Sequence, residues 1–208
     1  MARHRRSGVA DGSSGTAVPH HPQVGGEQRP TRQLAGGRGA ATTNVNLTVG
    51  AGAAIIVFVA GNLTAAARVD GVAMTLIGKT SNAAMYGITG LAAGARNVQV
   101  DRSGSSAHIV AVLSYTGVST ITGGALGSGS GNTPSGTPSG SGHLAVVGFD
   151  FGVSSGDVGS VVSNGTLRQL YRRTAANALA VADKDSAPVA ISNPTGGSWT
   201  SIGVWLST

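Results

Sequence analysis

Residues 43–60, TNVNLTVGAGAAIIVFVA, decide the fold class of this chain. In the first part of the stretch, Val45, Leu47 and Val49 alternate with polar residues, which is the period-two pattern of a strand with one buried face. Residues 53–60 are continuously apolar and precede a Gly-Asn turn signal, as expected of a central strand buried on both faces. The stretch therefore predicts two strands of a β-sheet protein.

The same patterns recur along the rest of the chain. Asp70-Gly71 predicts a tight hairpin joining 68–70 to 72–77, because Asp-Gly accepts the positive φ angles that such a turn needs. The other expected strands are 83–89, 96–101, 108–115, 143–151, 166–172, 178–183, 189–191 and 199–206. With little helical periodicity, the chain is predicted to be all-β, a two-sheet antiparallel β-sandwich of jelly-roll topology over residues 43–208.

Residues 1–42 show neither strand nor helix periodicity. Three prolines and repeated Gly-Gly pairs oppose regular helix and ladder pairing. We expect an extended, basic, Gly/Pro-rich arm. Because such a segment cannot bury a core of its own, it would be ordered by lying along a neighbouring subunit, and a disordered tail is the alternative.

Residues 119–142 interrupt the strand pattern inside the predicted domain. Residues 127–142 consist almost wholly of Gly, Ser, Thr and Pro, a composition typical of a flexible surface loop. A loop of this length is uncommon in a compact domain. We therefore expect it to be mobile or to be held by a partner.

The net charge of +6 is unevenly distributed. Residues 1–42 hold six arginines against two acids, giving +4, whereas residues 43–208 hold eight Lys/Arg against six Asp/Glu, giving +2. A basic arm can contact nucleic acid or an acidic protein surface, but no aromatic residues are interleaved here for base stacking, so a protein partner is favoured. The candidate partner-binding residues are Arg3, Arg5, Arg6, Arg29, Arg32 and Arg38 in the arm, and Arg168 and Arg172 on one face of an expected strand.

No group of residues in the sequence points to catalysis. The absence of cysteine excludes disulfides, thiol chemistry and Cys-ligated zinc. Asp183-Lys184-Asp185 could supply oxygen ligands to calcium, although an exposed loop of mixed charge is the favoured interpretation. Asp150 is predicted to face solvent on a strand. We therefore expect no catalytic, cofactor-binding or metal-binding residues, and the apolar run 51–60 is too short to span a bilayer.

Four segments carry a resemblance to a known family. They are VDGVAMTLIG at 69–78, MYGITGLAAG at 85–94, NVQVD at 97–101 and AVLSYTGV at 111–118. Together they resemble the jelly-roll domains of structural proteins of tailed bacteriophages, particularly phages of actinobacterial hosts, where the domain occurs in head decoration or minor tail proteins. The resemblance covers residues 43–208, rests on turns and strands, and brings no catalytic residues. Residues 1–42 and 127–142 fall outside it.

The resemblance implies a virion component. The chain is expected to be a non-enzymatic capsid decoration protein on the outer head surface, where its arm would bind the major capsid protein and stabilise the head. Further copies of the chain are expected as partners, with a trimer as one arrangement. The alternatives are a minor tail protein, or a carbohydrate-binding module for a host surface glycan. Sugar sites usually present exposed aromatic residues, and the Trp and Tyr residues of the predicted domain are Tyr86, Tyr115, Tyr171, Trp199 and Trp205. Trp199 and Trp205 share one face of the last expected strand, a position that suits a core as well as a binding site.

Overall fold

The computed structural model describes residues 31–37, 41–61, 64–103, 108–154 and 156–208. Strands dominate these ranges, and the single helical element within them is the three-residue 3-10 helix η1 (Val158–Ser160). All strand pairings are antiparallel, so the prediction of an all-β, sandwich-like fold is confirmed. The described residues contain no helix long and apolar enough to cross a membrane.

The strands form four sheets rather than the two that were predicted. The first inner sheet has the order β1 (Thr31–Gly37), β9 (His108–Tyr115), β3 (Ala53–Ala60), β7 (Ala83–Leu91) and β6 (Thr75–Lys79). The first outer sheet is β2 (Ala41–Val49), β8 (Gly94–Ser103), β4 (Thr64–Val69) and β5 (Val72–Ala73). The second inner sheet is β10 (Thr120–Ser130), β17 (Ser198–Ser207), β12 (Leu144–Gly152), β15 (Asn177–Lys184) and β14 (Thr166–Arg172). The second outer sheet is β11 (Ser135–Gly136), β16 (Val189–Ser192) and β13 (Val162–Ser163).

Three hydrophobic cores separate these sheets into four layers. Because side chains alternate along a strand, each inner sheet buries both of its faces. In β3, Ile55 and Val57 point into a core shared with the first outer sheet, whereas Ile56 and Phe58 point toward the second inner sheet. In β12, Val147 points into the third core, under the second outer sheet. The two-sheet prediction was wrong because it assigned these apolar strands to a single core.

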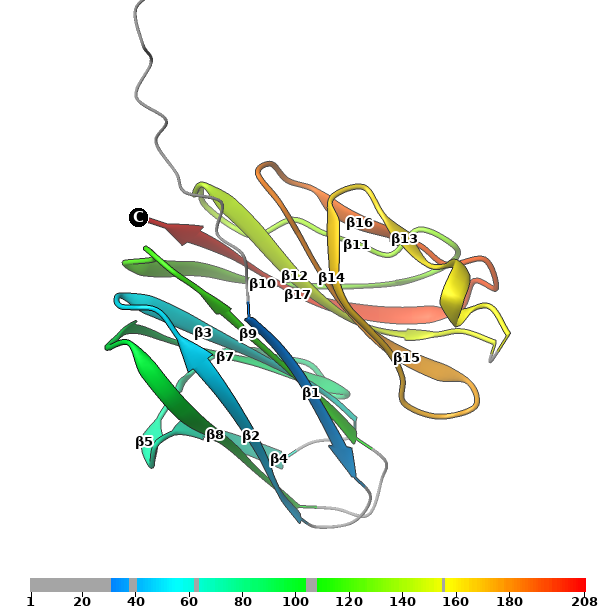
Figure 1. Ribbon diagram of the computed structural model, residues 1–208. Coiled ribbons are helices and arrows are strands. Elements are labelled where there is room, and N and C mark those ends of the chain that lie inside the picture. The colour runs from blue at the N-terminus through cyan, green and yellow to red at the C-terminus, as the bar shows by residue number, and fades with distance from the viewer. Residues whose placement is uncertain (1–30, 38–40, 62–63, 104–107, 155) are drawn as a thin grey trace, which may run out of the picture.

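The two pairs of sheets repeat one arrangement. When β1, β2, β3, β4, β6, β7, β8 and β9 are matched in order to β10 through β17, both inner sheets have the same strand order, and the outer sheets agree except for the added β5. Every strand up to β9 belongs to the first half (31–115), and every strand from β10 belongs to the second half (120–207). Figure 1 shows the halves as two stacked bodies, blue to green and green to red. We call the packing of the two inner sheets the seam.

The Asp70-Gly71 turn is confirmed. Asp70 has a φ of 49° and Gly71 a φ of 82°, and the Asp70 carboxylate accepts a hydrogen bond of 2.8 Å from the backbone N–H of Asn97. The predicted strand after the turn is divided in two at Met74. Its first part, β5, pairs with β4 in the outer sheet, and its second part, β6, pairs with β7 in the inner sheet. This strand therefore crosses from one sheet to the other.

The segment predicted as a loop over 119–142 contains two strands. β10 pairs along its length with β17, and β11 pairs with β16. The glycines of β10 have a steric role. A Cβ on Gly127 would lie 3.4 Å, and one on Gly129 only 2.7 Å, from the ring of Trp199. The structure differs from the prediction because low strand propensity is outweighed by this packing and by pairing with β17.

The strands also begin earlier than residue 43. Residues 31–37, predicted as the end of the arm, form β1 and pair with β9 in a continuous register from Thr31 opposite Ser114 to Gly37 opposite His108. β2 begins at Ala41. The rest of the predicted arm, residues 1–30 and 38–40, lies outside the described residues.

Candidate functional site

A buried polar cluster links the two halves at the seam. Tyr115, at the end of β9, donates a hydrogen bond of 3.1 Å from its hydroxyl to Oδ2 of Asp183 on β15. Arg168 on β14 donates from Nε to the same oxygen at 2.6 Å. Tyr115 is fully buried and Asp183 is 1% exposed. The cluster joins the first inner sheet to the second through a charge-assisted hydrogen bond.

The electrostatics of this cluster keep the Tyr115 hydroxyl protonated. Burial raises the pKa of the Tyr115 phenol well above its usual value, and the negative charge of Asp183 raises it further. Tyr115 therefore stays protonated and remains a hydrogen-bond donor at neutral pH. The β14 register shifts between Leu167 and Gln169, which places Arg168 at a bulge, a feature that redirects a side chain.

A second buried ion pair lies on the same face of the second inner sheet. Asp150 on β12 accepts hydrogen bonds of 3.2–3.3 Å from Nε and Nη2 of Arg173, and its side chain is 5% exposed. Burial raises the pKa of Asp150, and the charge and hydrogen bonds of Arg173 oppose that rise. The prediction that Asp150 faces solvent was wrong. It assumed that the face opposite Phe149 and Phe151 is open, whereas the first inner sheet covers it.

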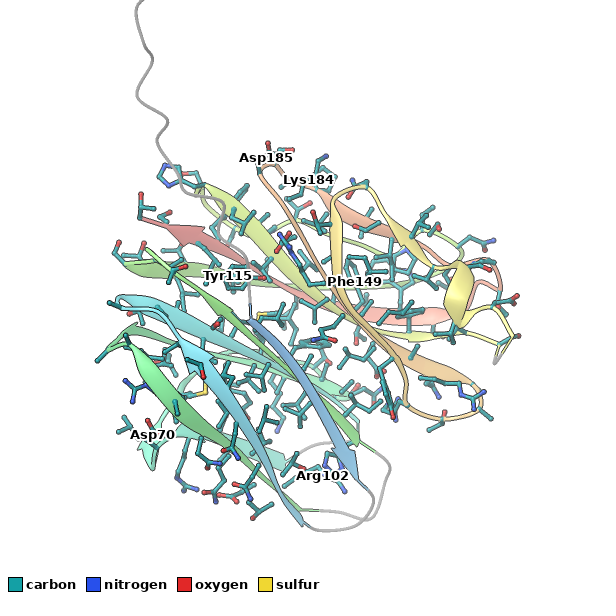
Figure 2. The ribbon with its side chains drawn as sticks, in the orientation of Figure 1. Asp70, Arg102, Tyr115, Phe149, Lys184 and Asp185 are labelled. Atoms are coloured by element: carbon teal, nitrogen blue, oxygen red, sulfur yellow. The ribbon has the colours of Figure 1, made fainter. Side chains whose placement is uncertain are left out.

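A third buried polar group lies in the first half, at the end of β9 opposite to Tyr115. Oγ1 of Thr43 lies 3.1 Å from Nε2 of His108, and both residues point toward the first core beside Arg102. His108 is 2% and Arg102 5% exposed. Burial lowers the pKa of His108, and the nearby charge of Arg102 lowers it further, so the imidazole is neutral at pH 7. Figure 2 shows Arg102 at the lower end of the first half, away from Tyr115.

The two carboxylates of Asp183-Lys184-Asp185 do not converge. Asp183 points into the seam, where it contacts Arg168, whereas Asp185 is exposed. Figure 2 places Lys184 and Asp185 at a turn on the edge of the second half. Within the part of the chain that the structure describes, no group of three or more His, Cys, Asp or Glu side chains could hold a metal ion.

The structure separates the arginines predicted to bind a partner. Arg3, Arg5, Arg6, Arg29 and Arg38 lie outside the described residues, and Arg32 lies within β1. Arg168 is ion-paired with Asp183, whereas Arg172 is exposed at the end of β14, beside Tyr171, which is 48% exposed. Their role in partner binding stays a prediction. Of the arginines in this set whose side chains the structure describes, Arg172 is the exposed one.

The tryptophans considered for sugar binding pack against the third core. Trp205 is 8% exposed and belongs to that core, and Trp199 is partly buried against it. The loop after β10 covers the face of β17 that bears them, because a Cβ on Gly142 would lie 2.6 Å from Cβ of Trp205. The expected shared face is therefore confirmed, with Trp205 buried on it and Trp199 partly buried.

Comparisons with known proteins give no relative. No protein-family model, no curated protein and no solved structure matches this chain.

Sequence reasoning missed the role of Asp150, Asp183 and Arg173. Asp150 interrupts an apolar run and Asp183 follows one. An acid in such a position is a signal of a buried ion pair. The partner arginines were recognisable as a cluster at 168–173. Which acid each would meet depends on the bulge in β14 and on the neighbouring sheet, and neither is visible in the sequence.

Proposed function

We propose that this chain is a non-enzymatic structural protein of a bacteriophage particle, a capsid decoration protein that its N-terminal segment fastens to the shell. The observation that best supports this is the position of β1, the strand that follows residues 1–30 in the sequence. β1 is an edge strand paired with β9 over seven residues. A pull along β1 is shared by the whole ladder, since the ladder bonds run perpendicular to the strands.

The internal packing supports a scaffolding role. Four layers of sheet are held by three cores, and the buried acids Asp150 and Asp183 are each paired with an arginine. The two ion pairs hold strands of the second inner sheet in place. A rigid body of this kind fits a protein that transmits force from its N-terminal segment to the rest of the molecule.

We further propose that each half has jelly-roll topology. A jelly roll consists of two sheets of four strands connected as Greek keys. In the first half the order β1-β9-β3-β7 faces β2-β8-β4-β5, and β5 continues into β6. The second half follows the same order with a smaller outer sheet. This proposal agrees with the family resemblance of residues 69–118.

The proposed partners are the major capsid protein and further copies of this chain, and the proposed location is the outer head surface. A minor tail protein is the alternative location of the same role. A carbohydrate-binding module is the second alternative, for which Tyr171 is the exposed aromatic residue, since Trp199 and Trp205 pack against the third core.

Purified particles test the proposal. Immunogold labelling with an antibody against residues 43–208 should place gold over the whole head. Gold confined to the tail would support the minor tail protein, and absence of the protein from particles by mass spectrometry would overturn the proposal.

The anchor is tested with a chain lacking residues 2–30, which keeps β1 intact, whereas removal of 2–42 would also delete that strand. We expect the shorter chain to keep its melting temperature but to be lost from particles. Full occupancy of particles by this chain would contradict the anchoring role.

A further inference from the structure

The two halves behave structurally as separate bodies joined by a short link. Residues 116–119 connect Tyr115 at the end of β9 to Thr120 at the start of β10, and in the part of the chain that the structure describes no sheet contains strands from both sides of this link. Each half has its own core, between its inner and outer sheets. Neither half borrows a strand from the other, so each could keep its internal ladder if the seam were opened.

The seam has the character of a protein–protein interface. Among the described residues no backbone ladder crosses it, and it is built from apolar side chains together with the Tyr115–Asp183 hydrogen bond and the ion pairs of Asp183 with Arg168 and of Asp150 with Arg173. The shapes of the two inner sheets are complementary at the seam. A Cβ on Gly148 would lie 2.3 Å from Cδ2 of Phe58, so the ring of Phe58 packs directly on the backbone of β12.

Part of the seam follows a two-fold relation between the halves. β3 contacts β12, its match in the repeat, and β6 contacts β10 as β14 contacts β1, whereas the contacts of β7 with β10 and β17 are not matched to the same extent by β15 with β1 and β9. The matched part resembles an isologous dimer, in which the same patch of both subunits takes part. Here the two subunits are two halves of one chain.

We propose that the seam is an exchangeable interface, through which two copies of this chain pair by packing the first half of each copy on the second half of the other. The exchanged dimer makes the same two seams as two closed chains, so its stability relative to them is set by the link and by concentration.

The link has features that favour exchange. It turns within four residues, with Gly117 at a φ of 70° and Val118 buried at the seam. Short links under constraint favour exchange of domains. The closed chain is favoured by an effective concentration in the millimolar range, so exchange is expected where copies are crowded to about that concentration. An exchanged dimer would carry two N-terminal segments, and bivalent attachment would strengthen its retention on a particle.

The full chain with a cysteine pair across the seam tests this proposal. Gly87 on β7 and Ile121 on β10 touch there, because a Cβ on Gly87 would lie 2.7 Å from Cδ1 of Ile121. The chain has no cysteine of its own. In the Gly87→Cys/Ile121→Cys variant, oxidation should give a disulfide within one chain if the halves are closed and between two chains if they are exchanged.

We expect a covalent dimer of twice 20.4 kDa after equilibration at about 1 mM, and mainly the internally bridged monomer at about 1 µM. Each single-cysteine variant should give no comparable dimer. A monomer at both concentrations would overturn the proposal.

A change in the link gives an independent readout without cysteines. Insertion of Gly-Ser-Gly-Ser after Gly117 relaxes the turn and should lower the dimer fraction at about 1 mM several-fold, as measured by light scattering on the otherwise native chain. If the dimer fraction does not respond to link length, the copies pair through another surface and the proposal is wrong. This experiment does not involve phage particles, so its failure is distinct from failure of the proposed decoration role.

Discussion

The lack of a side chain at Gly129 on β10 leaves room for the ring of Trp199 on β17. A Cβ at this position would lie only 2.7 Å from the ring, and a Cβ on Gly127 of the same strand would lie 3.4 Å from it. We expect Gly129→Ala to lower the free energy of unfolding by about 1–3 kcal/mol, the usual cost of overpacking, as measured by urea denaturation. The matched control is Gly159→Ala, where a Cβ meets no atom within 4 Å and a change within about 0.5 kcal/mol is expected. Equal losses for both variants would contradict a packing role for the β10 glycines.

His108 should give the protein a pH-dependent stability. Its pKa is lowered in the folded state by burial and by Arg102, so below the ordinary histidine pKa of about 6.5 the unfolded chain binds more protons than the folded chain. The contribution of His108 is therefore complete above pH 6.5 and is lost as the pH falls toward the lowered folded pKa. Chemical denaturation at pH 7.5 and 5.5 should show lower stability at pH 5.5. A His108→Gln variant should lose most of this difference. If it keeps the whole difference, another group is responsible.

The strands that sequence could predict are those whose own side chains are apolar. β3, β9 and β12 have the expected bounds or nearly so, because continuous or alternating apolar residues set their burial. β10 was missed because its stability comes from pairing with β17 and from the Trp199 ring. Propensity alone would exclude its run of Gly and Ser. The candidate site could not be predicted for the same reason, since Asp150 and Asp183 are buried by a neighbouring sheet that the sequence does not reveal.

β14 carries two arginines of the second inner sheet, Arg168 and Arg172. Arg168→Ala would leave Asp183 buried without its ion-pair partner, so we expect a loss of about 3–5 kcal/mol in the free energy of unfolding, measured by urea denaturation. Tyr115→Phe removes one hydrogen bond to the same oxygen and should cost less, about 1.5–3 kcal/mol. Arg172→Ala on the same strand is the control, with a change within about 0.5 kcal/mol because Arg172 is exposed. Similar losses at Arg168 and Arg172 would show that the Asp183 pair adds little.

At the scale of the whole molecule, the repeat could not be recognised from the sequence. Matching strands carry different residues at the seam, where the Phe58 ring of β3 packs on Gly148 of β12. The repeat resides in strand order, which depends on pairing between residues far apart in the chain. A sequence read as one sandwich therefore predicted a single core where three exist.

This architecture predicts how the chain unfolds. Both tryptophans lie on β17, so tryptophan fluorescence reports the second half, while far-UV circular dichroism reports both halves. In the native chain the seam couples the halves, and both signals should change in one transition.

Gly148→Val would place side-chain atoms where the Phe58 ring lies, which opens the seam but leaves the first and third cores intact. We expect the two signals to separate into distinct transitions in this variant, with the native chain and Gly156→Val, where a Cβ meets no atom within 4 Å, as controls. Coincident transitions in Gly148→Val would show that the halves are not independent folding units, because a disrupted seam would then unfold both cores together.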